Sequence, residues 1–293
     1  GDVINNNDIT ATAEAKLLAT NNVYNNGDIT ATTKAELSAT NNVYNHGNIT
    51  AQNVIMQANT NNVVMDAGDV IADKIMISAS NDIRHSNGTM QAAEASLTAT
   101  QNITLSNGHL IANTAFLTAT NGKLMQVLDG NGHGHGLAVD NLTVKAGNGV
   151  ELASHDNKLA NIYLDASGTG INIGNANVGN TALKIYVKDG NTLSEDITIT
   201  NYNNLAEGEL GNDIVIDGDL LTTGKLTLIN EESNIHNQGN VAGSEVLMDA
   251  VGDVTQEGSI NVTGSESTIT NFIGAKLVAG GNVSVIDGNI TSS

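Results

Sequence analysis

The stretch with the clearest potential for metal chemistry is DGNGHGHG at residues 129–136. It places His133 and His135 at alternate positions, with Asp129 four residues before the first histidine. Imidazole nitrogens and carboxylate oxygens are ligands that zinc uses in proteins, so these three residues are candidates for a surface metal site. The glycines between them favour a plain loop without a ligand, so we assign no metal site and keep these three residues as weak candidates only. A calcium-binding glycine-aspartate repeat needs several tandem copies. We therefore expect no cofactor, with calcium as the one alternative that the acidic composition allows.

The remaining carboxylates follow a pattern that does not favour catalysis. Enzymes that cleave polysaccharides need clustered carboxylates for acid and base steps, with basic side chains where the sugar is acidic. The chain has a single arginine, Arg84, and its adjacent acids Glu195–Asp196 and Glu231–Glu232 are typical of solvated turns. We assign no catalytic and no cofactor-binding residue, and expect the protein not to be an enzyme. A polysaccharide-active β-helix lyase or hydrolase is the alternative, which three or more acids converging on one groove would favour.

Composition excludes several classes of function. The formal net charge is −20, from 31 acidic and 11 basic residues, so the chain lacks the basic surface that binds nucleic acids and anionic membranes. It has no cysteine, which rules out disulfides and cysteine-based zinc sites. It has no run of 18 apolar residues, so we expect no membrane insertion. Aromatic residues make up 2% of the chain and proline is absent, which predicts a narrow interior and turns made by Gly and Asn.

A repeat of about 20 residues runs through the N-terminal part of the chain. ATNNVYNNGDITAT at residues 19–32 returns almost unchanged as ATNNVYNHGNITA at 39–51. Five columns keep their apolar or small character from repeat to repeat. The first is Ile9, Ile29, Ile49, Val70, Met90 and Leu110, and the second is Ala11, Ala31, Ala51, Ala72, Ala92 and Ala112. The other three begin at Leu17, Ala19 and Val23, and the last of them reaches Lys123.

Within each repeat the apolar residues alternate, as in Ala15, Leu17 and Ala19, which is typical of strands. Three short strands per repeat, separated by Asn or Gly turns, make one coil of a solenoid, and stacked coils bury a narrow core. Each residue then lies about 4.8 Å from its equivalent in the next coil. We predict an all-β fold, a right-handed parallel β-helix (solenoid) with about 20 residues and three short strands per coil.

The third repeat departs from this pattern. Gln57 and Asn59 fall in columns occupied by Leu and Ala, whereas Val54, Met56 and Ala58 form an apolar frame displaced by one residue. A one-residue slip exchanges the two faces of a strand, so the sequence leaves open which frame lies inside.

Two polar columns lie beside the apolar ones. The first is Thr20, Thr40, Thr60, Ser80, Thr100 and Thr120, and the second is Asn21, Asn41, Asn61, Asn81, Gln101 and Asn121. We expect the asparagines to form an amide ladder at a turn, because Asn tolerates turn conformations and equal amides pair from coil to coil. Two complete threonine ranks on a flat face would indicate ice binding, the third functional interpretation. The companion column, which begins at Leu18, is irregular.

After Thr120 the period loosens but the unit persists. LTVKAGNGV, VLMDAVGDV and AKLVAGGNV keep the spacing of AKLLATNNV near the start of the chain. We predict one β-helix domain over 1–293, with regular coils over 1–124 and loosened coils with loop insertions over 125–293. The longer loops are expected near 129–136, 188–209 and 261–272. Because the chain opens in the middle of a repeat, we expect it to be a fragment of a longer chain.

The stretches AKLVAGGNVSVIDGNITSS, LTVKAGNGVEL and VLMDAVGDVTQEGSINVTG resemble the degenerate repeats of filamentous haemagglutinin-like exoproteins. These are the secreted partners of bacterial two-partner secretion systems and include large adhesins. The resemblance covers essentially the whole chain. It implies a β-helical shaft that an outer-membrane transporter secretes and that is displayed at the cell surface. The family's N-terminal secretion domain, with its Asn-Pro motifs, has no counterpart here, since the chain has no proline.

These observations favour a non-enzymatic structural or adhesive shaft of a secreted bacterial surface protein, projecting or assembling into a stiff rod or fibre for attachment. The expected partners are a receptor or glycan on a host or neighbouring cell, further copies of the chain joined end to end through strand edges, and the outer-membrane transporter during secretion. A specific binding site is expected where the period fails, around residues 129–136 and 188–209, because loops carry function more often than regular coils.

Overall fold

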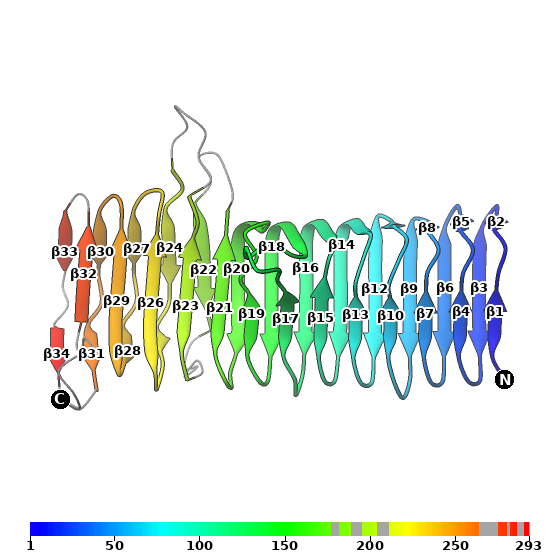
Figure 1. Ribbon diagram of the computed structural model, residues 1–293, viewed down its shortest axis with the longest axis horizontal. Helices are drawn as coiled ribbons and strands as arrows, with labels where there is room; N and C mark the ends of the chain where they lie inside the picture. The colour runs from blue at the N-terminus through cyan, green and yellow to red at the C-terminus, as the bar shows by residue number, and fades with distance from the viewer. Residues whose placement is uncertain are drawn as a thin grey trace. The chain divides into compact units, whose positions relative to one another are not determined.

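A computed structural model describes residues 1–176, 182–188, 195–203, 211–263, 275–279, 282–285 and 290–292. The described residues form strands and turns without a helix, and the strands stack in parallel in about 12 coils (Figure 1). The fold is therefore the all-β solenoid that the repeat predicts. By contacts the chain divides into two compact units, Gly1–Ala146 and Gly147–Ser293, which are described in turn.

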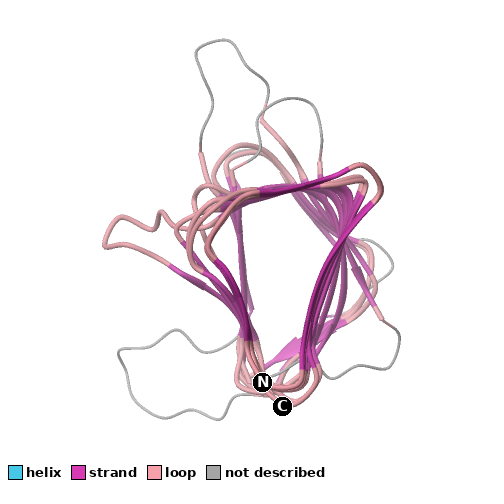
Figure 2. Cartoon of the chain, turned by 90° about the vertical axis from the view of Figure 1, so that its right-hand side faces the viewer, coloured by secondary structure: helices cyan, strands magenta, loops and turns pink. Residues whose placement is uncertain are grey.

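In the first unit each coil has three sides, with turns at the corners (Figure 2). The first stack contains β1 (Val3–Asn5), β4 (Val23–Asn25), β7 (Val43–Asn45), β10 (Val63–Met65), β13 (Ile83–His85), β15 (Ile103–Ser106) and β17 (Leu124–Val127). The second contains β2 (Ile9–Ala11), β5 (Ile29–Ala31), β8 (Ile49–Thr50) and β11 (Val70–Ile71). The third contains β3 (Glu14–Ala19), β6 (Lys34–Ala39), β9 (Asn53–Ala58) and β12 (Lys74–Ala79).

The last three coils of this unit have two strands instead of three. Single strands of eleven residues continue both the second and the third stack around the corner: β14 (Thr89–Ala99), β16 (His109–Ala119) and β18 (Gly136–Ala146). The first part of β14 pairs with β11 and its second part pairs with β12. The three-sided coil is thus kept while the break between two of its strands disappears.

Equivalent residues of successive coils stack on one another and form the core. Val23 pairs with Val43, and Val43 with Val63, and all three side chains are fully buried. Burying one aliphatic side chain of this size contributes about 1.5–3 kcal/mol, which explains why the column tolerates no polar residue. The predicted column that begins at Val23 needs one correction, because Ile103 pairs with Leu124 and not with Lys123.

The third coil shows which frame lies inside. Val54, Met56 and Ala58 pair with buried residues of β6 and are themselves buried, whereas Gln57 is exposed. The turn leading into β9 is one residue shorter than in the coil before, and the turn after β9 is one residue longer. The slip is therefore confined to one strand, and of the two frames that the sequence left open, the one with Val54, Met56 and Ala58 lies inside.

Glycines at one corner let successive coils approach closely. A Cβ atom at Gly47 would lie 2.1 Å from the carbonyl oxygen of Gly27, which no side chain tolerates. The corner positions that share this close approach are Gly27, Gly47, Gly68, Gly88 and Gly108.

The second unit also has three parallel stacks. The first contains β19 (Val150–Leu152), β21 (Ile171–Asn175), β23 (Ile197–Asn201), β26 (Lys225–Asn230), β29 (Glu245–Ala250) and β32 (Ala275–Ala279). The second contains β20 (Lys158–Ala166), β22 (Leu183–Val187), β24 (Ile214–Asp217), β27 (Ile235–Asn237), β30 (Val254–Gln256) and β33 (Val283–Val285). The third contains β25 (Leu220–Leu221), β28 (Val241–Gly243), β31 (Ile260–Val262) and β34 (Ile290–Ser292).

Two of the expected loops fall in this unit. The stretch 188–209 contains β23, so part of it is a strand, while 189–194 and 204–210 lie outside the described residues. The stretch 261–272 begins inside β31, and its part from 264 onward lies outside the described residues.

Candidate functional site

Residues 128–135 form a small hairpin between β17 and β18, where the sequence predicts a loop. An antiparallel bridge between Leu128 and Gly134 closes it. The Asp129 carboxylate accepts hydrogen bonds from the backbone N–H groups of Asn131 at 2.7 Å and His133 at 3.0 Å. This is the usual role of an aspartate that begins a tight turn, so Asp129 stabilises its own hairpin.

His135 ends the hairpin and enters the solenoid. Its side chain is fully buried, whereas His133 is exposed. Nε2 of His135 lies 2.7 Å from Nδ1 of His85 in β13, which is a hydrogen-bond distance. The carbonyl oxygen of His135 accepts a hydrogen bond of 2.5 Å from the side-chain amide of Gln126. The outer ring nitrogens, His85 Nε2 and His135 Nδ1, are buried without a hydrogen-bond partner.

Burial keeps both rings neutral. Because an imidazolium ion loses its hydration in the core, burial lowers the pKa of His85 to about 4 and that of His135 to about 3. At His85 the backbone of Asn87 and then Asp69 oppose this lowering of the pKa, and His109 adds to it. At His135 the ring of His85 and then His109 add to the lowering, and the backbone of Gly136 opposes it. Two neutral imidazoles share one N–H···N hydrogen bond, in which one ring donates and the other accepts.

The structure does not bring together the three residues that the sequence suggests as metal ligands. Asp129 and His133 lie in the hairpin, whereas His135 is buried beside His85. Within the described ranges, no three His, Asp or Glu side chains form a group that could hold a metal ion. The sequence located the unusual hairpin but missed His85, which lies 50 positions earlier in a regular coil.

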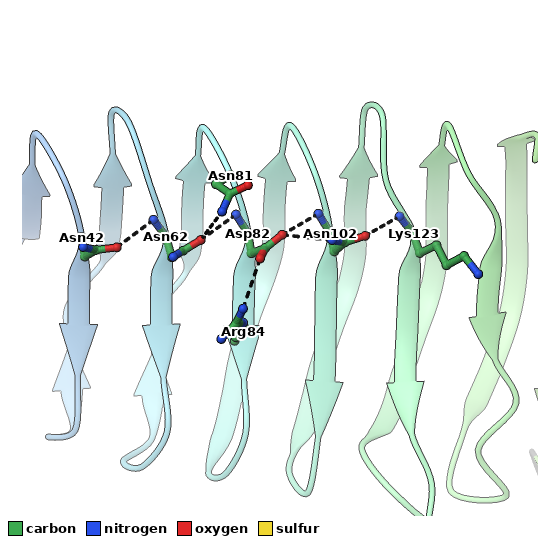
Figure 3. A network of polar contacts seen from close by, with 7 residues as sticks. All are labelled: Asn42, Asn62, Asn81, Asp82, Arg84, Asn102 and Lys123. Carbon is green, nitrogen blue, oxygen red and sulfur yellow. Dashed lines mark hydrogen bonds and ion pairs between the residues drawn. The ribbon is translucent and has the colours of Figure 1, made fainter.

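A ladder of polar side chains runs along one corner of the first unit (Figure 3). The side-chain oxygen of each member accepts a hydrogen bond of 2.9–3.1 Å from the backbone N–H of the next member, one coil further on. The members are Asp2, Asn22, Asn42, Asn62, Asp82 and Asn102, and the N–H of Lys123 ends the series. The ladder supplies acceptors for backbone N–H groups at the start of each strand in the first stack.

The amide ladder predicted at Asn21 is therefore displaced by one residue. The Asn41 side chain does donate to Asn21, but the continuous set of side chain to backbone bonds belongs to the column of Asn22. An Asn or Asp directly before Val, Ile or Leu, repeated at the coil spacing, is the sequence signal that identifies the ladder.

The same device recurs at further corners. A second ladder in the first unit, with bonds of 2.8–3.0 Å, contains Asp8, Asp28, Asn48, Asp69 and Thr89. In the second unit one ladder contains Asp213, Asn234, Asp253 and Asn282, and another contains Asp219, Asn240 and Ser259. The backbone N–H and the side-chain amide of Asn48 together hold the pKa of Asp28 below its ordinary value.

The adjacent acids that the sequence singles out also serve the fold. Glu232 is buried and accepts hydrogen bonds from the Asn201 side chain at 3.1 Å and the Asn212 backbone at 3.2 Å. Oδ1 of Asp196 accepts a hydrogen bond of 2.7 Å from the backbone N–H of Lys225. Amide donors thus hold both carboxylates, and the burial of Glu232 differs from the solvated turn that the sequence predicts for it.

The outward positions beside the threonine column of the first unit carry different residue types from coil to coil. Thr20 follows the end of β3, so the threonine column lies at a corner and not in a strand. The outward column that begins at Leu18 is interrupted by Gln57, and the same face carries an ion pair of 2.6 Å between Lys16 and Glu14. In the described coils this face therefore lacks the two complete hydroxyl ranks on which ice binding depends.

Tyrosines stack in pairs on outward positions of both units. The rings of Tyr24 and Tyr44 are 4.9 Å apart and inclined by 6°, and those of Tyr163 and Tyr186 are 4.8 Å apart and inclined by 11°. Each ring covers a face of its neighbour, so the stacks stabilise adjacent coils.

Comparison of the chain with protein families, with curated proteins and with solved structures found no match. The described part of the chain contains no helix that is long and apolar enough to cross a membrane.

Proposed function

We propose that the chain is a structural and adhesive shaft segment of a secreted bacterial surface protein, and that it has no catalytic activity. One observation supports this most strongly: polar side chains repeat the same coil-to-coil hydrogen bonds at corners of both units. Each bond contributes about 0.5–1.5 kcal/mol net, and a buried donor left without one costs about 1–3 kcal/mol. Polar residues with this role join coils to one another and resist their separation.

The composition fits the same proposal. A net charge of −20 favours solubility, and stacked coils without cysteine need no oxidising environment to fold. Secretion through an outer-membrane transporter, display at the cell surface, attachment to a receptor or glycan and end-to-end association belong to this proposal. They are supported by the resemblance of the repeats to secreted bacterial exoproteins.

A binding and turnover experiment tests the two parts of the proposal separately. The purified chain is applied to arrays of glycans and host matrix proteins, and is incubated with soluble polysaccharides while new reducing ends are measured. We expect saturable binding to at least one class of ligand and no new reducing ends. Cleavage of a polysaccharide would overturn the non-enzymatic part, and absence of binding across both arrays would overturn the adhesive part.

A further inference from the structure

We propose that the His85–His135 pair is a latch that holds the hairpin 128–135 against the solenoid, and that proton uptake releases it. The inference concerns one coil of the first unit and does not depend on the adhesive role.

His135 replaces a corner glycine. Gly136 pairs with His109, and its N–H donates a hydrogen bond of 2.9 Å to the carbonyl oxygen of Gly108, so His135 is equivalent to Gly108 in the preceding coil. A Cβ atom at Gly108 would lie 3.2 Å from Cε1 of His85. The missing side chain of Gly108 therefore leaves the space next to His85 that the ring of His135 reaches.

Two hydrogen bonds fasten the end of the hairpin. One joins the rings of His85 and His135, and the other joins the Gln126 amide to the His135 carbonyl oxygen. Both depend on His135 remaining inside the coil. The Leu128 bridge and the bonds to Asp129 lie within the hairpin and give it its own shape.

Protons act directly on the first of these bonds. The neutral pair holds one N–H between the rings and one on an outer nitrogen, and both outer nitrogens lack a partner. A first added proton places an imidazolium in the core, and a second one makes both facing nitrogens donors, so the hydrogen bond is lost. When His135 leaves the coil, water solvates both rings and stabilises the imidazolium ions by hydration.

The backbone of Asn87 favours a charged ring at His85 and that of Gly136 does so at His135, but burial outweighs both. Two titratable groups act on the rings from neighbouring corners, His109 and Asp69. His109 disfavours further positive charge, and Oδ1 of Asp69 already accepts the Thr89 N–H at 2.8 Å. The closed rings have pKa values of about 4 and about 3, against an ordinary 6.5 when solvated, so opening takes up protons and is favoured as pH falls from 6.5 towards 4.

Hydrogen exchange on the intact chain tests the latch. Amide protection is measured at pH 6.5, 5.5 and 4.5, with the rates corrected for the pH dependence of intrinsic exchange. The opening constant rises by up to tenfold per pH unit for each proton taken up. We expect a rise of at least tenfold over the two units at residues 133–137, and no such rise at β4 and β7.

Variants separate the latch from general acid effects. The double variant His85→Leu/His135→Leu should lose the pH dependence, because neither titratable ring remains. Leucine suits the column of His85, which holds Leu105 in the next coil. His133→Gln, in the same hairpin but exposed, should keep it. Equal pH dependence in the wild type and the double variant would overturn the proposal.

A spectroscopic measurement on the wild type decides the matter if the double variant does not fold. Ring ¹⁵N shifts of the seven histidines are followed from pH 7 to 4. We expect two rings to remain neutral at pH 5.5 with one hydrogen-bonded nitrogen each. Titration of all seven rings near their ordinary pKa would show that the pair is not a closed latch.

Discussion

Replacement of Asn62 by alanine tests the corner ladder most directly. Oδ1 of Asn62 accepts two hydrogen bonds, from the backbone N–H of Asp82 at 3.0 Å and from the side chain of Asn81 at 3.0 Å (Figure 3). Alanine removes both, and it leaves the N–H of Asp82 part-buried without an acceptor. The loss of the acceptor should destabilise this corner only, because β10 keeps its backbone pairing with β7 and β13.

The expected loss follows from the two bonds. A part-buried donor without a partner costs about 1–3 kcal/mol, and the loss of a side-chain bond near the surface costs less. We expect the free energy of local opening at Asp82 to fall by about 2 kcal/mol. Since each 1.4 kcal/mol corresponds to a factor of ten, exchange protection of the Asp82 amide should fall about 30-fold.

Native-state hydrogen exchange at residue resolution measures this loss, and two variants control it. Asn62→Asp keeps the side-chain oxygen and should keep most of the protection. Asn26→Ala removes an exposed bond of 2.8 Å to Asn6 and should change stability by less than about 0.5 kcal/mol. If Asn62→Ala has no larger effect than Asn26→Ala, the ladder does not stabilise the coils and the reasoning is refuted.

Three further predictions test the coil. Gly47→Ala places a Cβ 2.1 Å from a backbone oxygen and should lower the unfolding temperature far more than Gly130→Ala, whose Cβ meets nothing within 4 Å. Met56→Ala should lower the free energy of unfolding by about 2–5 kcal/mol in denaturant titrations, and Gln57→Ala by less than about 0.5 kcal/mol; the reverse order would support the other frame. Hydrogen bonds lower the pKa of Asp28, so the stability it adds is present above its ordinary pKa and is lost as pH falls through the lowered value. Acid titration of Asp28→Asn should lack this loss.

The fold was predictable because identical side chains stack. A residue type that is buried in one coil must be buried in the next, so the columns beginning at Ile9 and Val23 reveal the core without knowledge of the turns. The same logic fails where a turn changes length. At Met56 the sequence offered two frames, and at Lys123 one extra residue before Leu124 shifted the column. Turn lengths are set by corner geometry, which periodicity does not contain.

The ladders were predictable in kind but not in position. Asn21 and Asn22 repeat equally well, so the sequence alone does not show which side-chain oxygen faces the N–H of the next coil. That choice depends on the backbone direction at the corner, where Asn22 directly precedes the strand. The His85–His135 contact gave no periodic signal at all, because one partner belongs to a coil and the other to an insertion.

The two kinds of polar contact respond to protons in different ranges of pH, and this orders their loss. Asn22, Asn42 and Asn62 carry no titratable group, and hydrogen bonds lower the pKa of Asp28 in the second ladder. Acid therefore leaves these ladders intact until the carboxylates themselves take up protons. The rings of His85 and His135 take up protons below about pH 6.5 when solvated, but only near pH 4 and pH 3 when buried. Acid therefore favours their exposure already from pH 6.5 downward. Acidification should accordingly open the hairpin of the first unit while the coils that hold it remain folded.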